Sequence, residues 1–300
     1  MMTKRTDLAS EAHQLWREAA GETTKLAGVR AETVKENGFA VETVSILDEA
    51  GEAALGKPKG SYISIDIAPL MSREEGAFHR AAELLARRLG ALLNIKKGET
   101  VLVCGLGNSA ITPDNIGPGA VKNVLATRHL VEQMPEHFAA FRPVAVVEAG
   151  VLGTTGVESA EIVRAVAEKV RPAAIIAIDA LAARRMARIC RTLQLSDTGI
   201  VPGSGVGNAR SELSEKTLGV PVIAIGVPTV VDAATLAADL MEQAGIGESE
   251  SADLARFGGE MVVTPREIDT QVSECARLIA YGINMALHNI TADDVTMLIN

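Results

Sequence analysis

The stretch AAIIAID at residues 173–179 decides the fold prediction, because six apolar residues lead directly into a carboxylate. Three other short apolar runs have the same character: TVLVC at 100–104, VAVV at 144–147 and VPVIAI at 220–225. Runs that are apolar on both faces are typical of strands covered by helices on both sides. Helical patterns separate the runs, at 119–132, 158–170 and 180–193. This alternation predicts an α/β fold with a parallel or mixed sheet and helices on both faces.

The segments that flank these runs extend the prediction toward both ends of the chain. Residues 40–47 and 61–67 alternate apolar and polar side chains, which indicates two half-exposed strands with a turn region at 56–60 between them. We expect the first 35 residues to be partly helical. Further helices are predicted at 74–93, 233–244 and 266–288, and a polar surface loop at 245–259.

The composition argues against several classes of function. The 300 residues contain no apolar run near the roughly 20 residues that a membrane-spanning helix needs. The N-terminus is charged and lacks the apolar core of a signal peptide, so we expect a cytoplasmic protein. A net charge of -9 argues against direct nucleic-acid binding, which needs clustered Lys and Arg. The isolated Cys104, Cys190 and Cys275 predict free buried thiols rather than a zinc site or a redox pair.

Four acidic residues follow the apolar runs and are therefore expected near one edge of the sheet, where ligands bind in such folds. They are Asp114, Glu148, Asp179 and Asp232, and Asn108 shares the first loop with Asp114. Each has an ordinary alternative: Asp114 and Asp232 could cap helices, and Glu148 could be solvated or paired with Arg142. Asp179 is the hardest to explain as structural, because a charge at the tip of an apolar strand is costly to bury.

A pair of nearby carboxylates has a chemistry of its own. The two groups share a proton, because both cannot easily be ionised together. One then serves as general base toward water and the other as general acid, which suits peptide hydrolysis without a metal or a covalent intermediate. His129 could lean over the first loop.

The glycine-rich loop at 203–208, GSGVGN, offers a competing site. It lacks the Lys-Ser/Thr pair of a P-loop, and its last glycine comes too early for a GxGxxG fingerprint. A tight backbone turn is the preferred interpretation. Ser204 does not sit in a nucleophile elbow, because Pro202 stands where G-x-S-x-G requires glycine.

Several motifs, taken in order, carry a family resemblance. They are GLGNSAITPDNIGPGAV (105–121), TRHL (127–130), AIIAIDALAARR (174–185), SDTGIVPGSGVGNAR (196–210), GVPVIAIGVPTVVDA (219–233) and MVVTPREID (261–269). Together they resemble the germination proteases of spore-forming bacteria, over residues 5 to 290 or so. The resemblance implies an atypical aspartic endopeptidase that degrades small acid-soluble spore proteins, with Asp114 and Asp179 as catalytic residues and no cofactor or metal. It also implies a fold similar to hydrogenase maturation proteases (phosphorylase/hydrolase-like), zymogen synthesis, a homotetramer, and a place in the forespore or spore core.

The N-terminus fits this resemblance. Thr6 to Glu11, TDLASE, resembles the family's substrate site, an acid followed by an aliphatic residue, Ala, Ser and Glu. The implied self-processing cut lies between Asp7 and Leu8. Residues 1–7 would then be a propeptide, and residues 8–300 a single α/β peptidase domain. Without the resemblance, a helix start capped by Thr6 would be preferred.

Two other functions stay open at this point. A metal-dependent, maturation-type protease of the same fold could hold a divalent ion with Asp114, Asp179 and His129. A nucleotide-binding α/β protein could use residues 203–208. The family pattern also has a longer insert before the last motif, where this chain has only residues 245–259.

Overall fold

The computed structural model describes residues 5–20, 26–244 and 261–299, and the side chains of residues 242 and 243 are not among those described. One mixed sheet forms the centre of this part of the chain, with the strand order β1-β2-β3-β7-β8-β6-β4-β5 and β9 paired to β8. The strands are β1 (Val29–Glu36), β2 (Phe39–Ile46), β3 (Gly60–Asp66), β4 (Val101–Leu106), β5 (Val144–Gly150), β6 (Ala174–Ala183), β7 (Thr192–Ser196), β8 (Val222–Asp232) and β9 (Val262–Val263).

The sheet has a parallel half and an antiparallel half. Strands β8, β6, β4 and β5 are parallel neighbours, whereas β1, β2, β3, β7 and β8 pair antiparallel. Every residue of β4 and β8 is buried, as expected for strands covered on both faces. The prediction of a parallel or mixed sheet with helices on both faces is confirmed, and the sheet is mixed.

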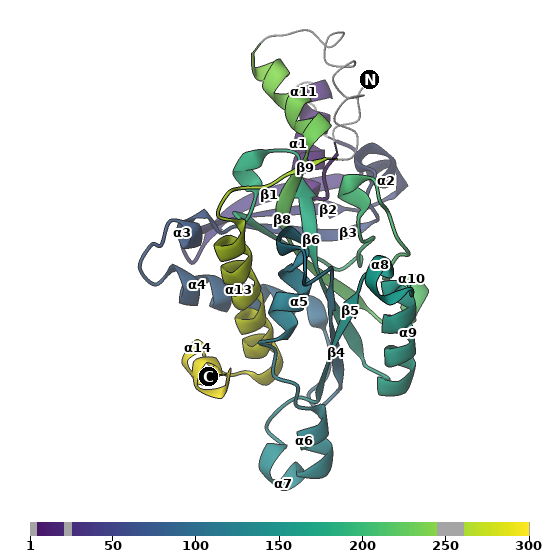
Figure 1. The fold of residues 1–300 in the computed structure, drawn as a ribbon, viewed down its shortest axis with the longest axis vertical. Coiled ribbons are helices and arrows are strands. Elements are labelled where there is room, and N and C mark those ends of the chain that lie inside the picture. Colours follow the sequence, from purple (N-terminus) through teal and green to yellow (C-terminus); the bar gives the residue numbers. More distant parts are fainter. Residues whose placement is uncertain (1–4, 21–25, 245–260, 300) are drawn as a thin grey trace.

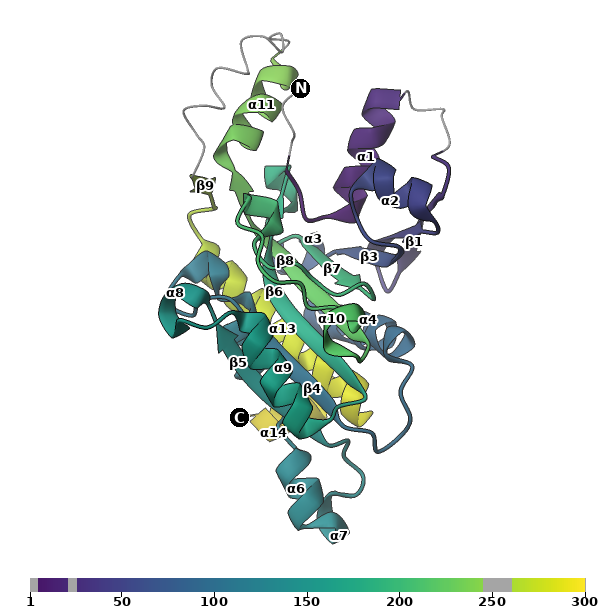
Figure 2. The same cartoon turned by 90° about the vertical axis from the view of Figure 1, so that its right-hand side faces the viewer.

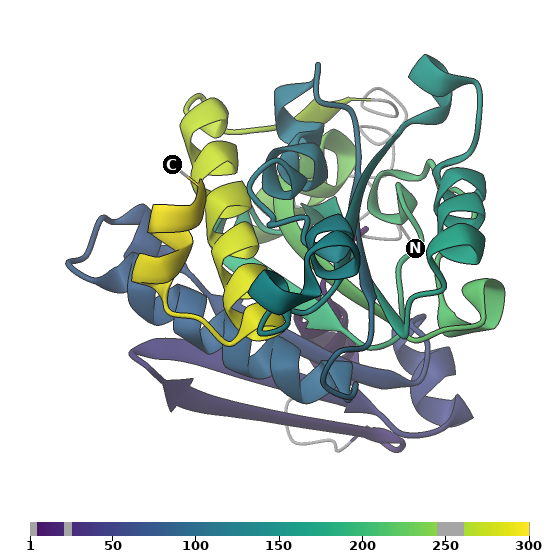
Figure 3. The same ribbon diagram turned by 90° about the horizontal axis from the view of Figure 1, so that it is seen from below.

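Helices cover both faces of the sheet (Figure 2 and Figure 3). On one face, α13 packs against α4 and α5 over the larger apolar core, and α14 lies beside α13. On the other face, α9 covers β4 and β5, while α1 and α2 close a smaller cluster over β2 and β3. These helices are α1 (Ala9–Ala20), α2 (Glu49–Leu55), α4 (Ala77–Leu93), α5 (Ile116–Val121), α9 (Ser159–Val170), α13 (Ile268–His288) and α14 (Ala292–Ile299).

The remaining helices are short or lie at the ends of the molecule. In Figure 1, α6 and α7 lie at the lower end and α11 at the upper end. They are α3 (Ala68–Met71), α6 (Arg128–Gln133), α7 (Pro135–Phe138), α8 (Leu152–Thr155), α10 (Glu215–Leu218) and α11 (Ala233–Gln243), with 3-10 turns η1 (Thr112–Asp114), η2 (Met186–Arg188) and η3 (Ser204–Val206). Among the described residues, none of these helices has the length and apolar character needed to cross a membrane.

The helix predicted at 180–193 is wrong. Strand β6 continues past Asp179 to Ala183, because Ala180 to Ala183 extend the ladder with β8. The chain then forms η2 and returns as β7, which the sequence did not reveal. The Ala-rich residues favour a helix locally, but pairing with a neighbouring strand decides their structure.

Other predictions are corrected in smaller ways. The helix expected at 119–132 is two helices, α5 and α6. The first 35 residues contain α1 as predicted, but also the start of β1, which turns into β2 through Asn37 and Gly38 with φ of 49° and 89°. This Asn-Gly pair is a strong hairpin signal.

Between β2 and β3 the chain forms α2, capped by Asp48, before the expected turn region. The loop predicted at 245–259 lies outside the described residues.

Candidate active site

A cavity of about 420 Å³ lies beyond the carboxyl ends of the parallel strands, the place where open α/β sheets bind ligands. Its wall is formed by the ends of β4 and β6, the loops that follow β4 and β5, the loop at 202–210, and part of the N-terminal segment. Polar side chains in the wall include Asp7, Asn108, Asp114, Glu158, Ser159, Asp179, Asn208, Arg210 and Thr229. Both predicted catalytic aspartates therefore line the same cavity.

Asp179 reaches the cavity from within β6. It pairs with Gly226 of β8 in the ladder, and it is 5% exposed. One carboxylate oxygen, Oδ1, accepts the main-chain N–H of Ala180 at 2.9 Å. Burial raises the pKa of Asp179 well above its usual value, and the nearby charge of Asp114 raises it further. The structure thus favours the protonated form of Asp179.

Asp114 reaches the same cavity from η1, in the loop that follows β4. Its Oδ2 accepts the main-chain N–H of Asn108 at 2.7 Å, and this hydrogen bond joins the start of the loop to its end. The tight return also needs Gly107, at φ +108°, because a Cβ there would lie 2.2 Å from the carbonyl oxygen of Asp114. Burial raises the pKa of Asp114, and the hydrogen bond from Asn108 acts in the opposite direction. Asn115, not Asp114, stands at the cap position of α5, so the alternative prediction that Asp114 caps this helix is wrong.

Close packing of α5 on the strand ends holds the Asp114 loop near Asp179. A Cβ on Gly117 would lie 2.2 Å from the carbonyl oxygen of Leu106 and 2.5 Å from that of Ile178. Only glycine therefore allows the start of α5 to lie directly on β4 and β6. Two carboxyl groups with unequal proton affinity, held at one cavity, can act as general base and general acid.

Of the four further residues predicted to line the site, Asn108, His129, Glu148 and Asp232, only Asn108 lines this cavity. Asp232 is the cap of α11, where its Oδ1 accepts the N–H and hydroxyl of Thr235 at 2.9 Å each. Glu148 is exposed on the edge strand β5, and Arg142 binds the carbonyl oxygens of Lys96 and Glu99 instead.

The placement of His129 is corrected as well. It is exposed on α6, beside the amino end of β5, where the N–H of Thr127 binds the carbonyl oxygen of Val144. The cavity lies at the carboxyl end of the parallel strands, so His129 does not lean over the first loop. Within the described ranges, no cluster of three or more His, Cys, Asp and Glu side chains is arranged to hold a metal ion.

Some residues of the wall were not predicted. Glu158 and Arg210 approach each other at 3.8 Å across the cavity wall, and Thr229 comes from within β8. Glu158 lies beyond the loop after β5, so the rule that ligands bind at strand ends could have included it. No local signal distinguishes Arg210 from the other arginines of the sequence.

The N-terminal segment also contributes to the wall. Asp7 lines the cavity, and its main-chain N–H donates to the carbonyl oxygen of Ala182 at 2.9 Å. Leu8 is completely buried in the large apolar core. The glycine-rich loop at 203–208 forms turns, with Gly203 at φ +73° and Gly207 at φ +74°, in agreement with the preferred interpretation.

The fold and the site together define a class: a mixed α/β protein with an acid pair at the carboxyl ends of its parallel strands. A family model described as germination protease matches residues 8–244. Germination proteases are also among the similar curated proteins. The one from Caldanaerobacter subterraneus subsp. tengcongensis is 42% identical, with 99% of this chain and 98% of that protein covered. The chain belongs to the germination protease family, and it is a protease.

Relatives from two other genera show that the similarity extends over the whole length. The germination protease of Clostridium tetani is 41% identical with 100% of both chains covered, and that of Bacillus cytotoxicus is 36% identical with 97% and 95% covered. A solved NiFe hydrogenase maturation protease, HycI from Thermococcus kodakarensis KOD1, is 15% identical with a TM-score of 0.36, covering 65% of this chain and 98% of that one. The strand order described above, rather than this distant likeness, defines the fold.

Proposed function

We propose that this protein is an endopeptidase that begins the degradation of small acid-soluble spore proteins during germination. In this proposal, Asp114 and Asp179 assist a water molecule in attacking the peptide bond, as in an atypical aspartic peptidase. The observation that carries the proposal is the shared cavity, in which the charge of Asp114 adds to burial in raising the pKa of Asp179. Membership of the germination protease family supports the substrate class.

The surroundings of the two acids support different roles for them. The N–H of Asn108 stabilises the ionised form of Asp114, so Asp114 takes the proton from water as the water oxygen attacks the carbonyl carbon. Asp179, buried and protonated, donates its proton to the leaving nitrogen. Its Oδ1 accepts the N–H of Ala180, so we assign the proton transfer to Oδ2.

The experiment replaces each acid by its amide and measures cleavage of a peptide containing Thr-Glu-Ile-Ala-Ser-Glu. We expect Asp114→Asn and Asp179→Asn each to lower kcat by about 10²–10⁴-fold, the usual contribution of a general acid or base. Asp232→Asn is the matched control, because asparagine still caps α11, and it should keep its activity. Near-normal activity in either test variant would remove that residue from the mechanism.

We also propose self-processing of a zymogen between Asp7 and Leu8, which would make residues 1–7 a propeptide and 8–300 one peptidase domain. The position of Asp7 in the wall of the cavity supports this proposal. Because Leu8 is buried in the core, the segment has to open before the bond can be cut. Mass spectrometry should show a new N-terminus at Leu8 after activation; an active wild type of unchanged mass would contradict the cut.

The family resemblance further supports a homotetramer located in the forespore or spore core. Light scattering on the purified chain tests the assembly, with four times the 31.4 kDa chain mass as the expected result. A monomeric mass at working concentration would count against it.

A further inference from the structure

The hydroxyl of Thr229 is a hydrogen-bond donor in the cavity wall that the mechanism above does not use. Thr229 belongs to β8, lines the cavity of the acid pair and is 1% exposed. Among the described residues, no group forms a hydrogen bond with this hydroxyl. A buried hydroxyl without a partner costs free energy, and a molecule bound in the cavity can supply the missing acceptor. The side chain is therefore a candidate for contact with the substrate.

An irregularity of the sheet brings Thr229 into the wall. In the ladder between β6 and β8, Leu181 pairs with Pro228. The next residue of β6, Ala182, pairs with Val230, so Thr229 is the extra residue of a β-bulge. Neighbouring residues of a regular strand point to opposite faces, whereas Thr229 and Val230 both line the cavity. Bulges often redirect a side chain beside an active site, and this one has that effect.

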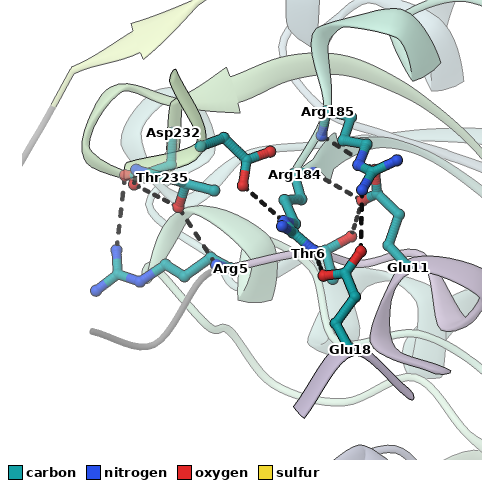
Figure 4. Close-up of polar contacts among 9 residues, drawn as sticks. Arg5, Thr6, Glu11, Glu18, Arg184, Arg185, Asp232 and Thr235 are labelled. Atoms are coloured by element: carbon teal, nitrogen blue, oxygen red, sulfur yellow. Dashed lines mark hydrogen bonds and ion pairs between the residues drawn. The ribbon is translucent and has the colours of Figure 1, made fainter. Parts of the chain in front are cut away.

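Contacts with other elements hold the bulge in place. The hydroxyl of Thr264, which follows β9, donates to the carbonyl oxygen of Thr229 at 2.8 Å. Three residues beyond Thr229, Asp232 caps α11 by accepting two hydrogen bonds from Thr235 (Figure 4). These contacts join two motifs of the family resemblance that are far apart in the sequence. A donor held in this way needs little reorganisation when charge develops beside it.

Thr229 lies on the strand next to the one that carries Asp179. Gly226, the ladder partner of Asp179, comes three residues before Thr229 in β8. The turn η1, which carries Asp114, contacts both β6 and β8. A peptide that enters the cavity therefore meets the two acids and the threonine in one wall.

Two other side-chain donors of this wall already have partners. The hydroxyl of Ser159 donates to the carbonyl oxygen of Gly150 at 2.8 Å. The guanidinium of Arg210 lies 3.8 Å from the carboxylate of Glu158. The two asparagines of the wall carry further amide donors, so they are included in the test.

We propose that Thr229 is a third catalytic residue, whose hydroxyl donates a hydrogen bond to the carbonyl oxygen of the peptide bond that is cut. The inference rests on the proposed function. As the water oxygen bonds to the carbonyl carbon, Asp114 takes a proton from the water. The electron pair of the C=O bond moves onto the carbonyl oxygen, where the Thr229 hydroxyl stabilises the negative charge.

The second half of the reaction restores the carbonyl group. The electron pair on the oxygen re-forms the C=O bond, the C–N bond breaks, and Asp179 donates its proton to the leaving nitrogen. The products are a carboxylic acid and an amine. Transfer of the proton from Asp114 to Asp179 returns the site to its starting state, and Thr229 keeps its own proton throughout.

Thr229→Val tests this role, because valine has nearly the same shape and lacks the hydroxyl. We expect kcat for the Thr-Glu-Ile-Ala-Ser-Glu peptide to fall about 10²-fold or more with little change in KM, the usual effect of losing one such donor. Thr229→Ser restores a hydroxyl and should recover most of the lost activity. If Thr229→Val is near normal while Asn108→Ala or Asn208→Ala loses kcat, the donor is an asparagine and the inference is wrong.

Thr192→Val is the matched control. Thr192 lies in β7, the strand beside β8, and is also 1% exposed. Its hydroxyl has no partner among the described residues either, but Thr192 does not line the cavity. The two valine variants should therefore have similar Tm values, and only Thr229→Val should lose activity. An equal loss of activity in both would indicate a general effect on the sheet and would overturn the inference.

Binding of a transition-state mimic measures the same contact without turnover. One peptide carries a hydroxyethylene group in place of the bond that is cut, and a second carries an ethylene group without the hydroxyl. The wild type should prefer the hydroxyl peptide, and Thr229→Val should lose about tenfold of that preference. Thr229→Ala gives the same comparison if the valine variant does not fold. An undiminished preference in the variant would overturn the inference.

Failure of the inference differs from failure of the proposed function. Normal cleavage by Thr229→Val, together with inactive Asp114→Asn and Asp179→Asn, would remove Thr229 and leave the acid pair standing. If the wild type cleaves no peptide, the proposed function fails and the role of Thr229 fails with it.

Discussion

At the residue scale, the position of Asp179 favours the proposed chemistry at the cost of stability. Its pKa is raised in the folded protein, so folded chains hold the proton more tightly than unfolded chains. The folded state is therefore most favoured below the unfolded pKa of about 4, where Asp179 is protonated in both states. As the pH rises from there toward the folded pKa, this residue makes folding less favourable.

Asp179→Asn should consequently be more stable than the wild type at neutral pH while being inactive. Asparagine keeps an oxygen for the Ala180 N–H and removes the buried charge. Thermal unfolding should give a higher Tm for the variant at pH 7, and the difference should shrink as the pH approaches 4. Asp293→Asn changes an exposed acid on α14 and should move the Tm little. A lower Tm for Asp179→Asn at every pH would contradict the argument.

At the element scale, β6 shows both how far the sequence predicts the fold and where prediction ends. Residues 174–178 are apolar throughout, and the strand follows from that pattern. Residues 180–183 are equally compatible with a helix, and they form a strand because β8 pairs with them. The sequence did not predict the antiparallel strand β7 either, because it forms by pairing with β3 and β8, which come from other parts of the chain.

The contact of α5 with the strand ends makes a specific prediction for Gly117→Ala. The added methyl group would meet main-chain atoms of Leu106 and Ile178, which cannot move aside as a flexible side chain could. We expect a loss of about 1–3 kcal/mol in the free energy of unfolding, measured in urea, and reduced peptidase activity because the Asp114 loop shifts.

Gly90→Ala provides the matched control for this substitution. Gly90 is an exposed residue inside α4, and a Cβ there would meet nothing within 4 Å. Alanine should stabilise this helix by about 0.4–1 kcal/mol. If Gly117→Ala lowers the free energy of unfolding and Gly90→Ala raises it, the loss at Gly117 comes from steric crowding. Equal changes in the two variants would contradict this explanation.

The ion pairs at the end of β6 join three elements. Arg184 is 3% exposed in its side chain and binds Asp239 of α11 at 2.7 Å and Glu18 of α1 at 2.8 Å. Arg184→Met should lower the free energy of unfolding by about 3–5 kcal/mol, because Asp239 would remain buried with its charge. Arg87→Met breaks a more exposed pair with Glu36 and should lose about 1 kcal/mol or less. Similar losses in the two variants would contradict this account.

At the scale of the whole molecule, topology decides which acids meet. The sequence placed four acids after strands, and the parallel half of the sheet brings Asp114 and Asp179 to one cavity. Asp232 also ends a parallel strand, but β8 is 11 residues long, and its last residue lies at the start of α11. The length of β8 and the path of the N-terminal segment depend on contacts between distant parts of the chain. The local sequence pattern therefore predicted neither that Asp232 lies outside the cavity nor that Asp7 lies in its wall.

His288 lies at the opposite end of the molecule from the cavity, and it should lower the free energy of unfolding at acidic pH. This residue ends α13, is 6% exposed, and packs edge-on against the ring of Phe141 at 5.3 Å between centroids. Burial lowers the pKa of His288 from 6.5 to about 4, and the charge of Arg142 acts in the same direction. The unfolded chain therefore binds a proton more readily than the folded protein.

Because the unfolded state takes up the proton first, the contribution of His288 to stability should fall as the pH drops below about 6.5 and stop falling near pH 4. The shift corresponds to about 3 kcal/mol. His288→Phe keeps a ring against Phe141 and removes the titration, so urea unfolding between pH 7 and pH 4 should show a smaller loss than in the wild type. His129→Gln alters an exposed histidine on α6 and should follow the wild-type curve. If the His288→Phe curve also follows the wild type, another group controls the acid limb.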